Sequence, residues 1–278
     1  MLCYSATQWI FGNEDIESSL ARLKKYKYDG VELAGEPDKI NVQEIRQLLV
    51  KHGLICTSIC GIYTADRDLS SSDPHLRAKA VQYVKDCVDM ASALGASHVI
   101  VVPSPVGRVD PITTAKAAWD NAVTSVREAG EYARLKSINL AVEALNRYET
   151  YLVSNLTVAL KFVTEVDVSS VKLMADLFHM NIEERNNAKA LKLIAPYLIH
   201  VHIADNTREA AGYGQTDFSE VIAALRDIKY PGPITMEFLP PIANPYLASE
   251  FEQKGDIYDR YAEQSINHIK KIEERIHG

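Results

Sequence analysis

Short apolar runs alternate with longer amphipathic stretches along the whole chain. The apolar runs are rich in β-branched residues, whereas the stretches between them repeat apolar side chains at helical spacing, as at Val81, Val84 and Val88. This alternation is typical of parallel strands joined by crossover helices. The predicted strands cover residues 2–6, 30–34, 54–61, 98–103, 139–145, 171–177, 198–205 and 233–239.

Helix boundaries are marked at several places between these runs. Asn41 followed by Glu44 predicts a capping box, and Gly53 predicts the end of the same helix. Asp73 before Pro74 predicts the start of the next helix. Each helix carries an apolar stripe that we expect to pack on the strands.

Eight strand-helix pairs without a break in composition predict the α/β class and a closed (β/α)8 TIM barrel, as a single domain over residues 1–278. An open doubly wound sheet usually begins with a glycine-rich turn, and the chain has neither G-x-G-x-x-G nor G-K-[ST]. Dinucleotide and nucleoside-triphosphate chemistry therefore has no support in the sequence.

Composition and charge narrow the range of partners. Hydrophobic residues make up 47% of the chain and charged residues 24%, as in ordinary soluble globular proteins. The net charge of −7 argues against nucleic acid and anionic membrane surfaces, and favours a small neutral substrate. The opening run MLCYSATQWIFGNED has no basic start and no long apolar segment, so we expect a cytoplasmic protein without a membrane span.

The cysteines do not form a closely spaced disulfide framework or a zinc-finger pattern. We expect all of them to be reduced. Cys60 ends the third strand and could approach a substrate, although a small buried apolar role fits it better. The cysteines are Cys3, Cys56, Cys60 and Cys87.

Four polar residues stand at the carboxyl ends of strands five to eight. In a (β/α)8 barrel these ends meet at one mouth, where the active site lies. Three carboxylates and an imidazole crowded together would repel and raise one another's pKa values unless a cation offsets them. The set predicts a site for Mn²⁺, Mg²⁺ or Co²⁺, with Zn²⁺ left open. The predicted ligands are Glu143, Asp176, His202 and Glu237.

Each of these residues alone could instead be a helix cap or a salt-bridge partner. His200 shares a strand face with His202 and lies deeper, so we expect a hydrogen-bonded core histidine rather than a ligand. Asp217 has cap spacing with Glu220 and is left out of the site.

Four longer motifs surround the predicted ligands. They are EALNRYE at 143–149, DLFHMN at 176–181, HIADNTR at 202–208 and MEF at 236–238. With these motifs the chain resembles ketose 3-epimerases of the D-tagatose and D-psicose type, within the xylose-isomerase-like barrel superfamily. The spacing inside the motifs matches that family, and the resemblance spans most of the chain.

The resemblance implies a metal-dependent sugar epimerase acting on C3 of a free ketose. In such enzymes one metal ion, here expected to be Mn²⁺, is held by residues matching the four predicted ligands and binds O2 and O3 of the open-chain sugar. Residues matching His179, Arg208 and Glu149 contact the sugar hydroxyls. The resemblance also implies a homodimer or homotetramer.

A proton beside a ketone is too weakly acidic for an unaided carboxylate, so the metal must stabilise the cis-enediolate. Glu143 and Glu237 are our acid/base pair on opposite faces of that intermediate, and their roles swap in the reverse direction. The alternative for Arg208 is a solvated loop cation, and Glu149 could merely pair with Arg147 or another surface cation.

The sequence leaves two alternatives for each of two other features. Tyr4 and Trp9 could contact the far end of a sugar or lie in the core. The segment 240–255, with Tyr246, Leu247 and Phe251, could be a lid or a subunit contact.

The loops after strands seven and eight hold few basic groups, which favours an unphosphorylated substrate.

Rival functions share parts of this pattern. The same glutamates and metal would serve an epimerase of a 3-dehydro sugar or glycoside, an aldose-ketose isomerase of the hydroxypyruvate or xylose type, or an inosose dehydratase. A DNA-repair endonuclease of this fold would need a histidine-rich zinc cluster and a basic groove. Few of the eight histidines stand at strand ends and the net charge is −7, so both observations argue against that function. A non-catalytic sugar-binding barrel would need no acid/base pair.

Overall fold

Eight parallel strands close into a barrel in the order of the sequence, with β8 paired to β1. The structure is a computed structural model that describes residues 2–241 and 254–277. The predicted (β/α)8 barrel is therefore confirmed, with strands β1 (Cys3–Thr7), β2 (Gly30–Gly35), β3 (Ile55–Gly61), β4 (His98–Val101), β5 (Asn139–Val142), β6 (Val171–Asp176), β7 (Leu198–Ile203) and β8 (Pro233–Met236).

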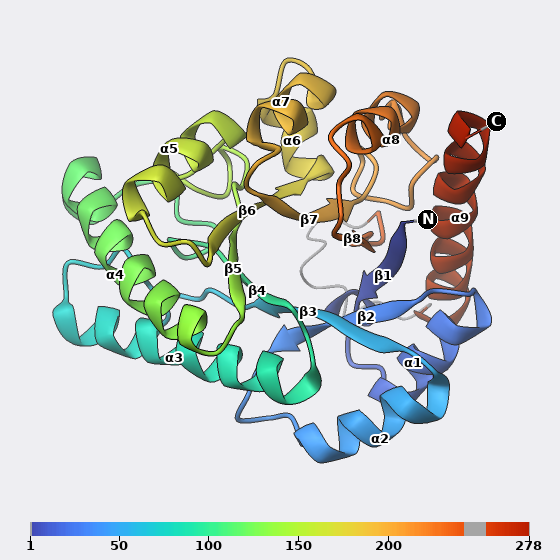
Figure 1. Ribbon diagram of the computed structural model, residues 1–278, viewed down its shortest axis with the longest axis horizontal. Coiled ribbons are helices and arrows are strands. Elements are labelled where there is room, and N and C mark those ends of the chain that lie inside the picture. Colours follow the sequence, from blue (N-terminus) through green and yellow to red (C-terminus); the bar gives the residue numbers. More distant parts are fainter. Residues whose placement is uncertain (1, 242–253, 278) are drawn as a thin grey trace.

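Helices form an outer ring around the strands (Figure 1). The β6–β7 connection holds two helices where the sequence pattern predicts one, because Asn186 starts a second helix with a side-chain cap. The helices of the described residues are η1 (Gln8–Phe11), α1 (Ile16–Lys25), α2 (Val42–His52), α3 (Pro74–Leu94), α4 (Ala115–Leu135), α5 (Leu156–Val166), α6 (Leu177–Glu183), α7 (Asn187–Ile194), α8 (Phe218–Asp227) and α9 (Lys254–His277).

The predicted helix starts are present. The side chain of Asn41 accepts hydrogen bonds from the first backbone N–H groups of α2, and Gly53 ends that helix with a φ of 63°. Asp73 accepts from the N–H of His75 at the start of α3. Asp217 caps α8, and its side chain accepts from the N–H of Glu220.

Several strands end earlier than predicted. β5 ends at Val142 and β8 at Met236, each three residues before the predicted end. The ladder nevertheless continues by one bond, because the N–H of Glu143 donates to Val101 O and the N–H of Glu237 to Ile203 O. The backbone then turns into the loops of the mouth, which frees these residues to face the barrel axis.

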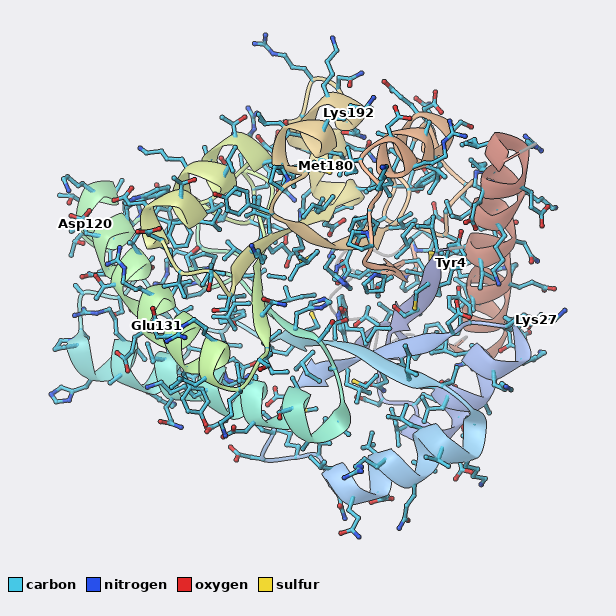
Figure 2. All side chains as sticks on the ribbon, in the orientation of Figure 1. Tyr4, Lys27, Asp120, Glu131, Met180 and Lys192 are labelled. Carbon is cyan, nitrogen blue, oxygen red and sulfur yellow. The ribbon has the colours of Figure 1, made fainter. Side chains whose placement is uncertain are left out.

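The core has two parts. A large apolar layer lies between the strands and the helices, and charged side chains such as Asp120, Glu131 and Lys192 lie on the outer faces of the helices (Figure 2). Among the described residues, a small apolar cluster of Cys60, Ile100, Ala141 and Met174 lies in the barrel interior. The rest of the interior is polar, and its fully buried residues include Ser5, Glu32, Ser58, His98, His200, His202 and Thr235.

Three further expectations concern the chain as a whole. All four cysteines are free thiols, as predicted. Within residues 2–241 and 254–277, no helix is both long and apolar enough to cross a membrane. The possible lid or subunit contact around Tyr246, Leu247 and Phe251 lies outside the described residues.

Candidate active site

The four predicted metal ligands lie at the mouth of the barrel because side chains alternate along each strand. Ala141 and Met174 point into the barrel interior, so the residues two positions later also face inward, at the carboxyl end. The inward positions nearest the mouth on β5 to β8 are held by Glu143, Asp176, His202 and Glu237.

These four side chains converge in a dry site. Glu143, Asp176 and His202 each offer a ligand atom, and the three atoms lie within 4.8 Å of one another. Glu237 approaches the same imidazole, with its Oε2 3.4 Å from Nδ1 of His202. All four residues are buried, and none is more than 7% exposed.

The arrangement fits a bound cation. In the described part of the chain, Oδ2 of Asp176 and Nδ1 of His202 are buried without a hydrogen-bond partner. Buried polar atoms are rarely left unpartnered in this way. Carboxylate oxygens with one imidazole nitrogen are a donor set for Mn²⁺, Mg²⁺ or Co²⁺, so the residues suit the divalent ion implied by the sequence.

The pKa values of the carboxylates reflect their crowding. Burial, together with repulsion from Glu237, raises the pKa of Asp176 to about 7. Burial also raises the pKa of Glu143 well above its ordinary value, with further contributions from Glu237 and Asp176. Burial acts the same way on Glu237, but His202 and Arg208 outweigh it and lower this pKa to about 2. The protein alone thus does not hold all three carboxylates ionised near neutral pH.

Asp176 has two roles at once. Its Oδ1 accepts a hydrogen bond from the N–H of Phe178 at 2.8 Å and caps α6. Its Oδ2 is turned toward the site. The cap and the ligand interpretations of this residue are therefore compatible, because each uses a different oxygen.

His179 is also buried at the mouth, at 3% exposure. Its Nδ1 accepts from the side-chain amide of Asn146 at 2.8 Å, so Nε2 carries the proton of the neutral ring. Nε2 lies 3.4 Å from Asp176 Oδ2. Burial and the nearby Arg208 lower the pKa of His179, which keeps the ring a neutral donor.

Arg208 lies inside the site rather than on the surface. It is 5% exposed, so the alternative of a solvated loop cation is wrong. Its guanidinium lies 3.6 Å from Glu149 Oε1 and 3.5 Å from Glu237 Oε2, over the ring of Phe178. The backbone of Arg208 has a φ of 63°, a conformation that is uncommon for a non-glycine residue.

The side chain of Glu149 points toward the site, where it lies near Arg208, rather than toward Arg147. Arg147 pairs with Glu183, which removes the suggested Glu149–Arg147 pair. Instead, Oε1 of Glu149 accepts from Asn146 Nδ2 at 2.9 Å. Asn146 thus links two of the predicted sugar contacts, Glu149 and His179.

A cavity of about 500 Å³ opens above the four converging side chains. This size lies in the usual range for small-molecule sites. Glu143, Glu149, His179, Arg208 and Glu237 give it a polar side. The other side is largely apolar and is formed by Trp9, Cys60, Ile62, Tyr63, Val102, Val106 and Leu145.

The two aromatic residues near the amino terminus differ in position. Trp9 lines the cavity. Tyr4 is 1% exposed, and its hydroxyl donates to Glu273 Oε2 at 2.6 Å, so it belongs to the core. Cys60 also lines the cavity, and burial raises the pKa of its thiol well above the ordinary value.

Sequence reasoning missed two residues of this site. Glu32 on β2 reaches Nε2 of His202 at 3.0 Å, and Asn146 joins His179 to Glu149. A signal for Glu32 exists in the run GVELAG, where a single glutamate interrupts a strand that is otherwise apolar. The pair of buried histidines in HVH also requires an acceptor.

Comparison with known proteins agrees with this geometry. The sequence model of the family described as "Xylose isomerase-like TIM barrel" matches residues 20–271. The chain is 33% identical to an L-ribulose 3-epimerase of Methylomonas sp. (strain DH-1), over 83% of this chain and 81% of the relative. It is 30% identical to a 3-dehydro-D-guloside 4-epimerase of Escherichia coli (strain K12), over 82% of this chain and 88% of the relative.

A solved structure shows the same architecture. The D-psicose 3-epimerase of Clostridium cellulolyticum H10, described with D-tagatose, superimposes with a TM-score of 0.88. The match covers 98% of this chain and 99% of that one, at 25% sequence identity. Since the family's sequence pattern extends over most of the chain and the barrel agrees with it, the protein belongs to the xylose isomerase-like TIM barrel family.

Proposed function

We propose that this protein is a metal-dependent epimerase that inverts C3 of a free ketose. The observation that carries the proposal is the convergence of Glu143 and Glu237 with Asp176 and His202 in one buried donor set for a cation, at the wall of a cavity of monosaccharide size. Mn²⁺ is the ion we expect. Relatives named as ketose epimerases support the substrate class.

The cation, when bound, supplies positive charge that polarises the sugar carbonyl at C2. One glutamate removes the proton from C3, and the electron pair of that C–H bond moves toward O2 to give a planar enediolate. The other glutamate, which starts protonated, returns a proton to C3 from the opposite face. The unlike surroundings of Glu143 and Glu237 favour one protonated and one ionised carboxyl group at a time.

The remaining side chains orient the sugar. The Nε2–H of His179 and the guanidinium of Arg208 are donors on the polar side of the cavity, suited to O1 and O2. Glu149 is an acceptor for a sugar hydroxyl. Because Asn146 fixes both His179 and Glu149, these contacts are held before the substrate arrives.

A free sugar fits better than a phosphorylated one. Among the described residues that line the cavity, Arg208 is the sole Lys or Arg, and it already faces two carboxylates. We also propose a homodimer or homotetramer, which light scattering after gel filtration would test.

A second candidate is an epimerase of a 3-dehydro glycoside. The Escherichia coli relative with that type of name is 30% identical, and the same two glutamates could act beside a carbonyl at another carbon. The position of the carbonyl distinguishes the two candidates.

The deciding experiment is incubation of the Mn²⁺-loaded protein with free ketoses and with 3-keto sugars in D₂O, followed by NMR. We expect deuterium at C3 of a ketose together with its C3 epimer. Deuterium at C4 of a 3-keto glycoside would favour the second candidate. No exchange on any sugar of the panel, with Mn²⁺ bound, would overturn both.

A further inference from the structure

A buried glutamate lies on the far side of His202 from the cation site. Nδ1 of His202 faces Glu237, whereas Nε2 lies 3.0 Å from Oε1 of Glu32. Glu32 comes from β2, on another side of the barrel, and is fully buried. It has no part in the proton transfers proposed above.

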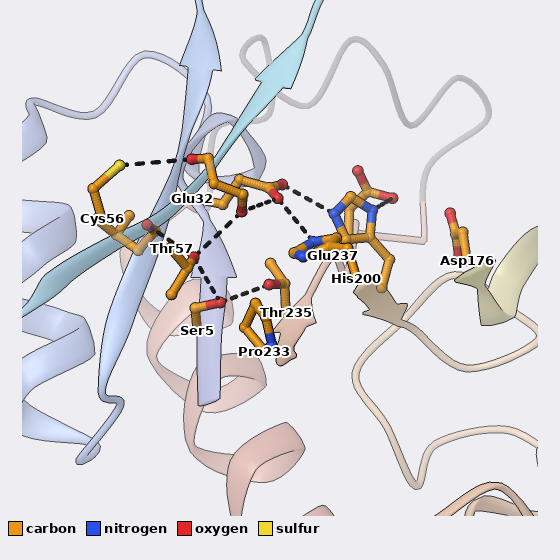
Figure 3. A network of polar contacts seen from close by, with 12 residues as sticks. Ser5, Glu32, Cys56, Thr57, Asp176, His200, Pro233, Thr235 and Glu237 are labelled. Carbon is orange, nitrogen blue, oxygen red and sulfur yellow. Dashed lines mark hydrogen bonds and ion pairs between the residues drawn. The ribbon is translucent and has the colours of Figure 1, made fainter. Parts of the chain in front are cut away.

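Donors surround the carboxylate of Glu32 (Figure 3). The hydroxyl of Ser58 donates to Oε2 at 2.6 Å, and Nε2 of His200 lies 2.9 Å from the same oxygen. Nε2 of His202 lies 3.0 Å from Oε1. An ionised carboxylate only accepts hydrogen bonds, so the imidazole nitrogen that contacts it must carry a proton.

This contact determines which nitrogen of His202 can bind a metal. A neutral imidazole has one N–H and one lone pair. With the proton on Nε2, the lone pair is on Nδ1, the nitrogen that lies 3.4 Å from Glu237 Oε2 and is buried without a hydrogen-bond partner. Metal-bound histidines commonly donate their other N–H to a carboxylate, which fixes both the tautomer and the ring orientation.

We propose that Glu32 is a positioning residue of the cation site, which holds His202 as the Nε2–H tautomer with Nδ1 as the ligand atom. The role rests on the metal dependence of the proposed function. The group Glu32, His200 and His202 could also be considered a second metal site, since its ligand atoms lie within 4.8 Å of one another. The Nε2–H of His202 excludes that use.

The test compares Glu32→Gln with the unaltered protein by calorimetric titration of the full chain with Mn²⁺. The amide keeps the size of the side chain but removes its charge, and it can donate to Nε2 and so permit the wrong tautomer. We expect Mn²⁺ affinity to fall roughly ten- to a hundredfold. Glu32→Asp, which keeps the charge on a shorter side chain, should recover part of the loss.

Glu273→Gln is the matched control. Glu273 is similarly buried, at 7% exposure, and accepts from Tyr4 and from the N–H of Leu2, far from the cation site. We expect it to leave Mn²⁺ affinity unchanged. Equal affinities in Glu32→Gln and the unaltered protein, or a second bound Mn²⁺ that Glu32→Gln removes, would overturn the role of Glu32. Absence of Mn²⁺ binding to the unaltered protein would overturn the metal site itself.

A second measurement needs no variant. In ¹⁵N-histidine NMR spectra of the Mg²⁺-loaded protein, we expect His202 to show a protonated Nε2 and an Nδ1 shifted by the ion. A proton on Nδ1, or an ion-dependent shift at Nε2, would overturn the proposal even if Glu32→Gln failed to fold.

Discussion

At the scale of single residues, the two glutamates of the site should be separable by experiment. In the proposed mechanism each glutamate acts on C3 from its own face, so removal of one leaves the other able to exchange a proton without inverting the carbon. We expect Glu143→Gln and Glu237→Gln each to slow epimerisation by about a hundredfold or more. Each variant should still exchange the C3 hydrogen of one epimer, and the epimer should differ between the two.

The measurement is deuterium incorporation into each pure epimer by NMR, with bound Mn²⁺ quantified in parallel because both glutamates are also predicted ligands. Full turnover in both variants would contradict the assigned chemistry. Exchange into the same epimer in both would contradict the two-face arrangement.

Asn146 gives a second prediction at this scale. Its amide donates to Glu149 and to His179, so Asn146→Ala releases both predicted sugar contacts. Loss of these hydrogen bonds costs about 1–3 kcal/mol, and we expect kcat/KM to fall roughly tenfold or more. Asn121→Ala is the control, since Asn121 donates to Ser71 O from α4 and does not line the cavity. Equal activity of the Asn146 variant and the control would refute this role.

The sequence could predict the site residues that stand at the end of a strand, because a strand end is recognisable from its own short run of residues. The four ligand candidates each follow a strand, and the barrel then brings them together. Glu32 follows no such rule, because it meets His202 across the barrel at a separation of 170 residues. Asn146 was visible within EALNRYE, but its bond to His179 depends on how α6 is placed against the β5 loop.

At the scale of elements, the N-cap of helix α3 can be tested separately from catalysis. Asp73 accepts from the N–H of His75 at the start of α3, a position that the sequence predicts from Asp73 before Pro74. We expect Asp73→Ala to lower the free energy of unfolding by about 1 kcal/mol in urea titrations. Asp120→Ala, in an exposed position within α4, should stay within about 0.5 kcal/mol. Equal effects would argue against the cap.

The elements themselves follow from patterns with a short period, which explains why all eight strands were predicted. The carboxyl ends of β5 and β8 were not predicted correctly, because the apolar runs LAVEAL and ITMEFL continue past the point where the backbone leaves the sheet. The end of a strand depends on its neighbours. β5 stops at Val142 beside the end of β4 at Val101, and this pairing is not written in either run alone.

At the scale of the whole molecule, stability should depend on pH and on the metal together. In the metal-free protein the pKa of Asp176 is about 7, against an ordinary value of 3.8 in an unfolded chain. The folded state therefore holds a proton that the unfolded state releases between these values. This stabilisation is complete below about pH 4 and is lost as the pH rises through 7.

We therefore expect the unfolding temperature of the protein in EDTA to fall from pH 5 to pH 8, and to fall less in Asp176→Asn. Mn²⁺ at about a hundred times its Kd should add about 2.7 kcal/mol of stability. At one fixed Mn²⁺ concentration the added stability should be larger at pH 8 than at pH 6, because binding displaces protons and is therefore tighter at the higher pH. Scanning calorimetry measures both effects. A pH slope equal in the variant and the unaltered protein would contradict the assignment to Asp176.

The pairing of β8 with β1 has a consequence for how the chain folds during synthesis. Tyr4 lies opposite Ile234, so the sheet cannot close until a strand translated more than two hundred residues later has left the ribosome. Until then β1 has a bare edge, and such edges invite pairing with other chains. Glu237, which immediately follows β8, is the last of the four candidate ligands to be made. A nascent chain thus completes its candidate metal site and loses its exposed edge in the same late step.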